Sequence, residues 1–211
     1  DDDPAAGGWA ATRPLLFVPG NHDVRGPHAH DLATALTPWM PGAHPVSGPT
    51  ATAWFGGTYC FALRHGPVAI IGLDTGEDKP DDTPVYAELN STVEYRAQEL
   101  AWFKNHVETE PRVSSAPFRV ILMHQPQWGW LEDGPGEWIE TADAAGVDLV
   151  IAGHRHRFVY TPPGPDVDHD YHLLVLDQDQ VAKVDATDQE LRVVVTGLDG
   201  SVVHTLVIPR G

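Results

Sequence analysis

Four short apolar runs, rich in β-branched residues, constrain the fold of this chain more than any other feature. They are Leu15 to Val18, Val68 to Leu73, Phe118 to Met123 and Leu149 to Ala152. Each run is nearly continuous rather than alternating, which is typical of strands covered on both faces. Helical patterns lie between them, one beginning near Ser91 or Thr92 and one covering Glu137 to Ala145. This alternation predicts an α/β core that extends to about Arg157.

The first helical pattern has an apolar stripe that we expect to face the sheet. The stripe consists of Val93, Ala97, Leu100, Phe103 and Val107. Ser91 or Asn90 is a plausible N-terminal cap for this helix, and Gly146 stands where a C-terminal cap of the second helix is expected.

The chain changes character after Tyr160, where Thr161-Pro162-Pro163-Gly164-Pro165 interrupts any regular element. Strand-like segments then follow one another: His172 to Leu176, Gln180 to Ala186, Glu190 to Thr196 and Ser201 to Ile208. Asp199-Gly200 predicts a tight hairpin between the last two. We therefore expect residues 161–211 to form a β-rich tail of the same core, so that residues 1–211 make one domain.

Charge and composition exclude several classes of function. The formal net charge of −17 over 211 residues argues against a broad basic face that grips nucleic acid or anionic lipid. No apolar run approaches the ~18 residues that a membrane span needs, and the N-terminal residues have no signal-peptide pattern. Cys60 is the only cysteine, so an intrachain disulfide cannot form, and we expect it to be a small buried hydrophobe.

Polar residues follow three of the apolar runs at the point where each predicted strand ends. Asn21 and His22 follow the first run, His124 follows the third, and His154 and His156 follow the fourth. In α/β sheets such strand ends bring side chains from separate loops together. Imidazole nitrogen and amide oxygen suit zinc, iron, manganese or nickel, so the pattern predicts a metal site. The alternative is that polar residues cap these strand ends by chance.

The glycines beside these residues are part of the prediction. Gly20 and Gly153 would let the backbone turn sharply as it leaves each strand.

Three segments together resemble a known family. Gly20-Asn21-His22-Asp23, then His124 after a β-run, then Gly153-His154-Arg155-His156 resemble the last three of five signature blocks of the calcineurin-like metallophosphoesterases. The connecting segments Ile71 to Thr75 and Gln98 to Phe103 are also similar, and bacterial members akin to purple acid phosphatases are the most similar. The resemblance implies two packed mixed β-sheets flanked by helices, a four-layer αββα fold.

The same resemblance implies an activity and a cofactor. Members hydrolyse phosphate mono- or diesters through a two-metal site and a bridging hydroxide, so the implied partner is a small-molecule phosphate ester and the implied cofactors are two transition metal ions (iron, manganese or zinc). It also implies a secreted or periplasmic location. Residue types alone do not choose among the metals or name the substrate.

Carried over to this sequence, the family pattern assigns individual roles. Asn21, His124 and His154 would bind one metal and His156 the other, while His22 would be the catalytic histidine that protonates the leaving oxygen. Asp23 would orient His22 or, equally, cap the following turn. Arg25 and Arg155 would contact the phosphate, or else form surface ion pairs. These last two residues complete the predicted site.

The chain departs from the family pattern at its start. The first two blocks, Asp-x-His and Gly-Asp-x-x-Asp, should precede Gly20 and supply the remaining ligands, but residues 1–19 contain neither. Asp170-Tyr171-His172 matches Asp-x-His, yet it follows the last block and would require a permuted chain. We therefore expect the C-terminal half of a catalytic domain, with the missing blocks on a preceding segment or another chain. The alternatives are a degenerate, non-catalytic binding or structural homologue, or a nuclease of the same fold, which the negative charge disfavours.

Overall fold

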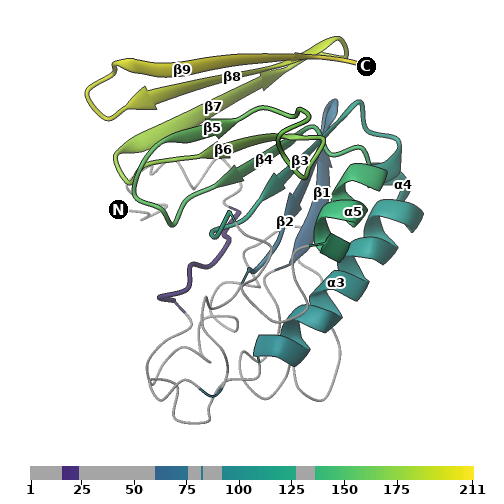
Figure 1. The fold of residues 1–211 in the computed structure, drawn as a ribbon. Helices are drawn as coiled ribbons and strands as arrows, with labels where there is room; N and C mark the ends of the chain where they lie inside the picture. Colours follow the sequence, from purple (N-terminus) through teal and green to yellow (C-terminus); the bar gives the residue numbers. More distant parts are fainter. Residues whose placement is uncertain (1–15, 24–59, 76–81, 83–91, 127–135) are drawn as a thin grey trace, which may run out of the picture.

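The computed structural model describes residues 16–23, 60–75, 82, 92–126 and 136–211, and these form two β-sheets and three helices (Figure 1). The six-stranded sheet, sheet A, has the order β1-β2-β3-β4-β6-β5. Its strands are β1 (Phe61–His65), β2 (Val68–Gly72), β3 (Phe118–Leu122), β4 (Leu149–Ala152), β5 (Val159–Thr161) and β6 (His172–Val175). The three-stranded sheet, sheet B, contains β7 (Gln180–Ala186), β8 (Glu190–Gly197) and β9 (Val202–Pro209).

The centre of sheet A is parallel, and this decides where the polar residues meet. Strands β2, β3, β4 and β6 run in the same direction, whereas β1 and β5 pair antiparallel at the two edges. Helices α3 (Thr92–Thr109), α4 (Pro111–Ser114) and α5 (Gly136–Ala144) lie between the parallel strands in the chain. The carboxyl ends of all four parallel strands therefore lie at one edge of the sheet.

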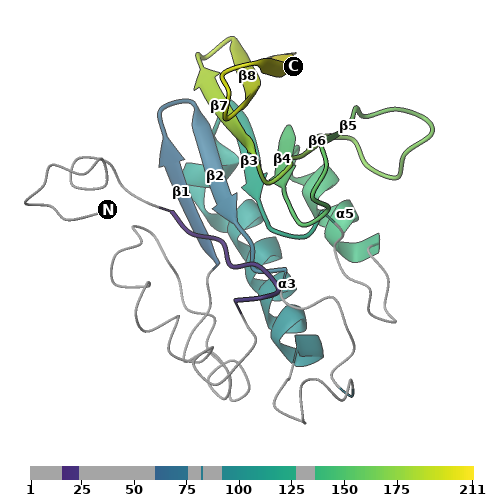
Figure 2. The ribbon, with the colours of Figure 1, turned by 90° about the vertical axis from the view of Figure 1, so that its left-hand side faces the viewer.

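Both faces of sheet A are covered, as the continuous apolar runs predict. The helices pack on one face and sheet B on the other, a layering that is visible from two directions (Figures 1 and 2). In β3, Phe118 and Val120 face sheet B, where Leu191 and Val193 meet them, while Ile121 faces the helices. Alternate residues of a strand thus lie in two different cores, one under the helices and one between the two sheets.

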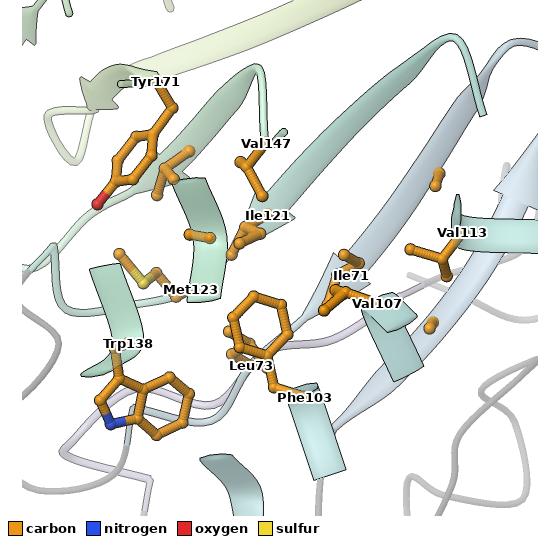
Figure 3. Packing of buried hydrophobic residues seen from close by; sticks show 14 of the residues in the cluster. Ile71, Leu73, Phe103, Val107, Val113, Ile121, Met123, Trp138, Val147 and Tyr171 are labelled. Carbon is orange, nitrogen blue, oxygen red and sulfur yellow. The ribbon is translucent and has the colours of Figure 1, made fainter. Parts of the chain in front are cut away.

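The core under the helices joins strands and helices through large side chains. Phe103 of α3 is fully buried, and its ring stacks on that of Trp138 of α5 with ring centroids 6.1 Å apart. Ile71 and Ile121 of the sheet belong to the same cluster (Figure 3). This contact fixes α3 and α5 side by side over the parallel strands.

The layering agrees with the expected fold in part. The mixed sheet, the helices on its one face and the second sheet on its other face are present. Within the part of the chain that the structure describes, no helix covers the outer face of sheet B, where Val181 and Val207 are exposed. The fourth layer of the expected αββα arrangement is not found among the described residues. None of the described helices is long and apolar enough to cross a membrane.

The predicted stripe of α3 is wrong over its first turns. Phe103 and Val107 are buried as expected, but Val93 and Ala97 are exposed. Their places in the interior are taken by Tyr95, Arg96 and Glu99, which are all buried. The helix turns these polar side chains inward because the polar end of β2 lies beneath them and supplies hydrogen-bonding partners. The expected caps Asn90 and Ser91 lie outside the described residues.

Other elements differ from the expectation at particular positions. Residues 16–18 belong to neither sheet, although their apolar run predicts a strand. Strand β5 and the short helix α4 were not anticipated. The predicted hairpin is confirmed: Gly200 has φ of 84°, and the Gly197 N–H donates to the Ser201 carbonyl at 2.9 Å. Gly146, after α5, has φ of 64°, which fits its predicted capping role.

Candidate metal centre

The candidate site lies at the carboxyl edge of the parallel strands. Thr75 follows β2, His124 follows β3, His154 and His156 follow β4, and Asp177 follows β6. The turn of residues 20–23 reaches the same edge from the N-terminal side. The sheet therefore brings together residues that stand more than a hundred positions apart in the sequence, such as Asn21 and His124.

Three side chains of the predicted site meet at short distances. The Asn21 Oδ1 atom lies 3.1 Å from His124 Nε2, and His154 Nδ1 lies 3.3 Å from the same nitrogen. The rings of His124 and His154 meet edge to face, with their centroids 5.1 Å apart. Asn21 is almost completely buried, with 3% of its surface exposed. The structure thus brings together the three residues that the family pattern assigns to one metal.

The spacing of these atoms suits ligands of one ion. Two donors, each about 2.1 Å from a tetrahedral zinc-type ion, stand about 3.4 Å from one another. The observed separations of 3.1 and 3.3 Å are close to that value. One amide oxygen and two imidazole nitrogens are also a donor set that zinc, iron and manganese accept. The two separations from His124 Nε2 and the donor types of Asn21, His124 and His154 are compatible with ligands of one metal ion.

The electrostatics of His124 favour a neutral ring. Burial lowers the pKa of His124, and the neighbouring His154 lowers it further, while Asp23 acts in the opposite direction. A metal ligand must present an unprotonated nitrogen. A lowered pKa keeps His124 in that state at neutral pH.

The turn after β4 is strained at both of its histidines. His154 has φ of 68° and His156 has φ of 48°, so both lie in the left-handed region that residues with a β-carbon seldom adopt. Such conformations cost about 1 kcal/mol or more each and persist mainly at functional sites. The strain therefore supports a functional role for the Gly153–His156 turn.

The turn of residues 20–23 is built around its first and last residues. The Gly20 N–H donates to Asp23 Oδ2 at 2.7 Å, and the Asp23 N–H donates to the Gly20 carbonyl at 2.9 Å. Asp23 thus closes the turn of residues 20–23, and the turn that it was expected to cap lies outside the described residues. Gly20 and Gly153 do not have the positive φ that a sharp glycine turn would show. Glycine instead allows the backbone of residue 20 to lie close to the His124 ring, since a β-carbon there would stand 3.2 Å from His124 Cε1.

The remaining predicted residues are less closely placed. His22 is exposed, as are Arg155 and His156. Arg25 lies outside the described residues. A cavity of about 460 Å³ contains His124, His154 and His156 in its wall. His156 is thus in the site, at its open side.

One residue of this edge was missed. Asp177 follows β6 and lines the same cavity as the three histidines. The rule that flagged the other strand ends would have found it, because the segment His172 to Leu176 is a predicted strand and a carboxylate follows it directly.

The described residues do not form a complete cluster of metal-binding side chains. Within the described ranges, no group of three or more His, Cys, Asp and Glu side chains is placed to hold a metal ion. The cluster above reaches three donors only through the amide of Asn21. The carboxylates that the family pattern requires are not found in it.

Asp170-Tyr171-His172 does not supply the missing ligands. His172 begins β6 and pairs with Leu149, the first residue of β4, so it lies at the amino edge of the parallel strands. The candidate site lies at their carboxyl edge. His172 Nδ1 instead lies 2.9 Å from the Tyr160 hydroxyl, and the permuted arrangement is wrong for this chain.

Cys60 is fully buried, as predicted, but it is not a purely apolar residue. Its Sγ lies 3.0 Å from Glu99 Oε1, and burial raises the pKa of the thiol well above its usual value.

Comparison with known families identifies the fold that carries this site. The sequence model described as calcineurin-like phosphoesterase matches residues 5–158, which include all three motif segments. The chain belongs to this family. No match was found among curated protein sequences.

Two solved structures that match this chain are remote from it in sequence. Purple acid phosphatase PPD1 from yellow lupin (Lupinus luteus) seeds matches with a TM-score of 0.57 and 14% identity, over 92% of this chain and 40% of that one. GAP50, the anchor in the inner membrane complex of Plasmodium, matches with a TM-score of 0.43 and 14% identity, over 75% of this chain and 56% of that one. The lupin enzyme therefore supports likeness of fold. The chain spans less than two thirds of either relative.

Proposed function

We propose that this chain contributes the C-terminal part of a metal-dependent phosphoesterase site that hydrolyses phosphate mono- or diesters. The observation that carries the proposal is the meeting of Asn21, His124 and His154 within 3.1 to 3.3 Å at the carboxyl edge of the sheet. Two metal ions in such a site supply an activated water and stabilise the charge that develops on the phosphate. Membership of the family supports the reaction class.

The chain's own residues would divide the work as follows. Asn21, His124 and His154 hold one ion and His156 contributes to the second. His22, which is exposed at the turn beside Asn21, would approach the ester and protonate the leaving oxygen. Arg155, exposed between His154 and His156, can pair with phosphate oxygens.

We further propose that the carboxylate ligands come from chain outside these 211 residues. A groove of about 590 Å³ supports this, because it runs between β7 and the face of sheet A and includes Ile70, Leu122 and Ile151 in its wall. Leu122, Ile151 and Leu176 also line the cavity at the metal centre, so the two hollows share a wall. Added strands in this groove would end beside the histidines.

The test compares the chain alone with the chain extended by the coding sequence upstream of residue 1. Hydrolysis of p-nitrophenyl phosphate and of bis(p-nitrophenyl) phosphate is measured with added manganese, zinc or iron. We expect the extended protein to be active, and His22→Ala to lower kcat by about 10²- to 10⁴-fold with metal still bound.

His65→Ala is the matched control. His65 is exposed, and it pairs with Val68 at the start of β2, so it lies at the opposite edge of the sheet. Full activity in His22→Ala would contradict the mechanism. Metal binding without hydrolysis of either ester would favour the non-catalytic homologue.

A further inference from the structure

A buried polar cluster joins helix α3 to the strand end beside the metal centre. It contains two carboxylates, Asp74 and Glu99, each with 1% of its surface exposed, together with Tyr95, Arg96 and Thr75. None of these residues belongs to the predicted metal site. Buried charged groups are costly unless hydrogen bonds compensate them, so their contacts indicate what the cluster holds in place.

The contacts all hold the segment that follows β2. The Asp74 N–H donates to Glu99 Oε1, and the Tyr95 hydroxyl donates to Asp74 Oδ2 at 2.7 Å. Arg96 Nη1 donates to the Thr75 carbonyl at 2.9 Å. Its guanidinium also lies 5.8 Å from the centre of the Trp138 ring on α5. Helix α3 thereby fixes the backbone of residues 74 and 75, and α5 contacts the Arg96 side chain that takes part in this.

Thr75 passes this constraint to the metal centre. The Gln125 N–H donates to Thr75 Oγ1 at 3.0 Å, and Gln125 is fully buried, so no solvent can replace the hydroxyl. The peptide group that makes this bond joins His124 to Gln125. On its other side the His124 carbonyl accepts a hydrogen bond from the Gly153 N–H at 2.9 Å.

We propose that Thr75 is a positioning residue for His124, which it orients by fixing the His124–Gln125 peptide against the end of β2. The His124 carbonyl is held by the turn that carries His154, and the next N–H is held by Thr75. The two bonds fix the backbone from which the imidazole extends toward Asn21 and His154. The consequence for metal binding rests on the proposed function, whereas the consequence for the ring itself does not.

The experiment compares Thr75→Val with Thr75→Ser in the 211-residue chain. Valine has nearly the same shape as threonine but leaves the Gln125 N–H without its acceptor, while serine keeps the hydroxyl. The first readout is the ¹H–¹³C spectrum of the His124 ring in the metal-free chain. The second is cobalt(II) affinity by titration.

We expect Thr75→Val to shift or broaden the His124 ring signals and to weaken cobalt affinity by about 10- to 100-fold. Thr75→Ser should retain both properties to within about threefold. Val113→Ala is the control for general destabilisation, because Val113 is fully buried in α4, where it takes no part in this cluster.

The outcomes separate this inference from the phosphoesterase proposal. A folded Thr75→Val chain with unchanged His124 signals would overturn the inference, as would equal changes in Val113→Ala. Should the wild-type chain bind no cobalt, the proposed function would lose its support. The metal-free ring signals would still decide the role of Thr75.

Discussion

At the scale of single residues, the space around the His124 ring is the most sensitive feature of the site. A β-carbon at residue 20 would stand 3.2 to 3.3 Å from three atoms of that ring. We expect Gly20→Ala to displace the imidazole and to weaken zinc or cobalt binding about tenfold, as changes beside a metal ligand commonly do. Calorimetric titration measures this affinity.

Gly164→Ala is the matched control for that substitution. A β-carbon at residue 164 meets no atom within 4 Å, so its metal affinity should equal that of the wild type. Equal affinities in Gly20→Ala and wild type would show that the ring is not held by this contact.

Glu99 sets a pH dependence of stability. Burial, and then the charge of Asp74, raise the pKa of Glu99 to about 8, whereas an unfolded glutamate titrates near about 4.3. Between these values the folded chain keeps a proton that the unfolded chain releases. The contribution of Glu99 to the free energy of unfolding therefore falls as pH rises through this interval.

Glu99→Gln should remove that part of the dependence while keeping an oxygen that accepts from the Asp74 N–H. Urea unfolding at about pH 5 and about pH 8 measures the difference. We expect the variant to lose less stability than the wild type between the two pH values. The same loss in both proteins would mean that Glu99 is ionised in the folded chain.

His124 and His154 could be predicted from sequence because they follow parallel strands, whose carboxyl ends meet at one edge of a sheet. The same rule also pointed to Asn21, although the apolar run before it joins neither sheet. It did not reveal that Gly20 is needed for close approach. Distances between residues remote in sequence depend on tertiary packing, which the local pattern does not contain.

At the scale of elements, α3 shows where an apolar stripe misleads. Phe103 is fully buried, whereas Val93 of the same predicted stripe is 47% exposed. Phe103→Ala should lower the free energy of unfolding by about 3–5 kcal/mol, because it empties a well-packed position against Trp138. Val93→Ala should change it by less than about 0.5 kcal/mol.

Chemical denaturation of both variants gives these values. A loss of several kcal/mol in Val93→Ala would restore the predicted stripe and contradict the observed orientation of the helix.

The strands that precede the motif histidines were predictable because both of their faces are apolar, and β4 begins and ends where its pattern indicates. The segments that differ from the prediction do so because their structure depends on contacts with other parts of the chain. Residues 16–18 have a strand-like sequence but join neither sheet, and β5 exists through its pairing with β6. The inward face of α3 is polar because Asp74 and Thr75 lie beneath it, which no periodicity in the helix could reveal.

At the scale of the whole molecule, the two sheets and three helices of the described residues fix the carboxyl edge of the parallel strands in sheet A. Parallel pairing of β2, β3, β4 and β6 places the residues that follow these strands at that edge, and the turn of residues 20–23 brings Asn21 to it. Sheet B and the helices pack on the two faces of the strands. The net charge of −17 disfavours polyanionic nucleic acid and is compatible with a small phosphate ester held by metal ions.

The metal content of the purified 211-residue chain, measured by plasma mass spectrometry after incubation with manganese and zinc, tests the central claim most directly. We predict about one tightly held ion per chain, from the three donors Asn21, His124 and His154. The ion should remain in His65→Ala and be lost in His124→Ala. A wild-type chain without metal, or a His124→Ala chain that keeps it, would contradict the account.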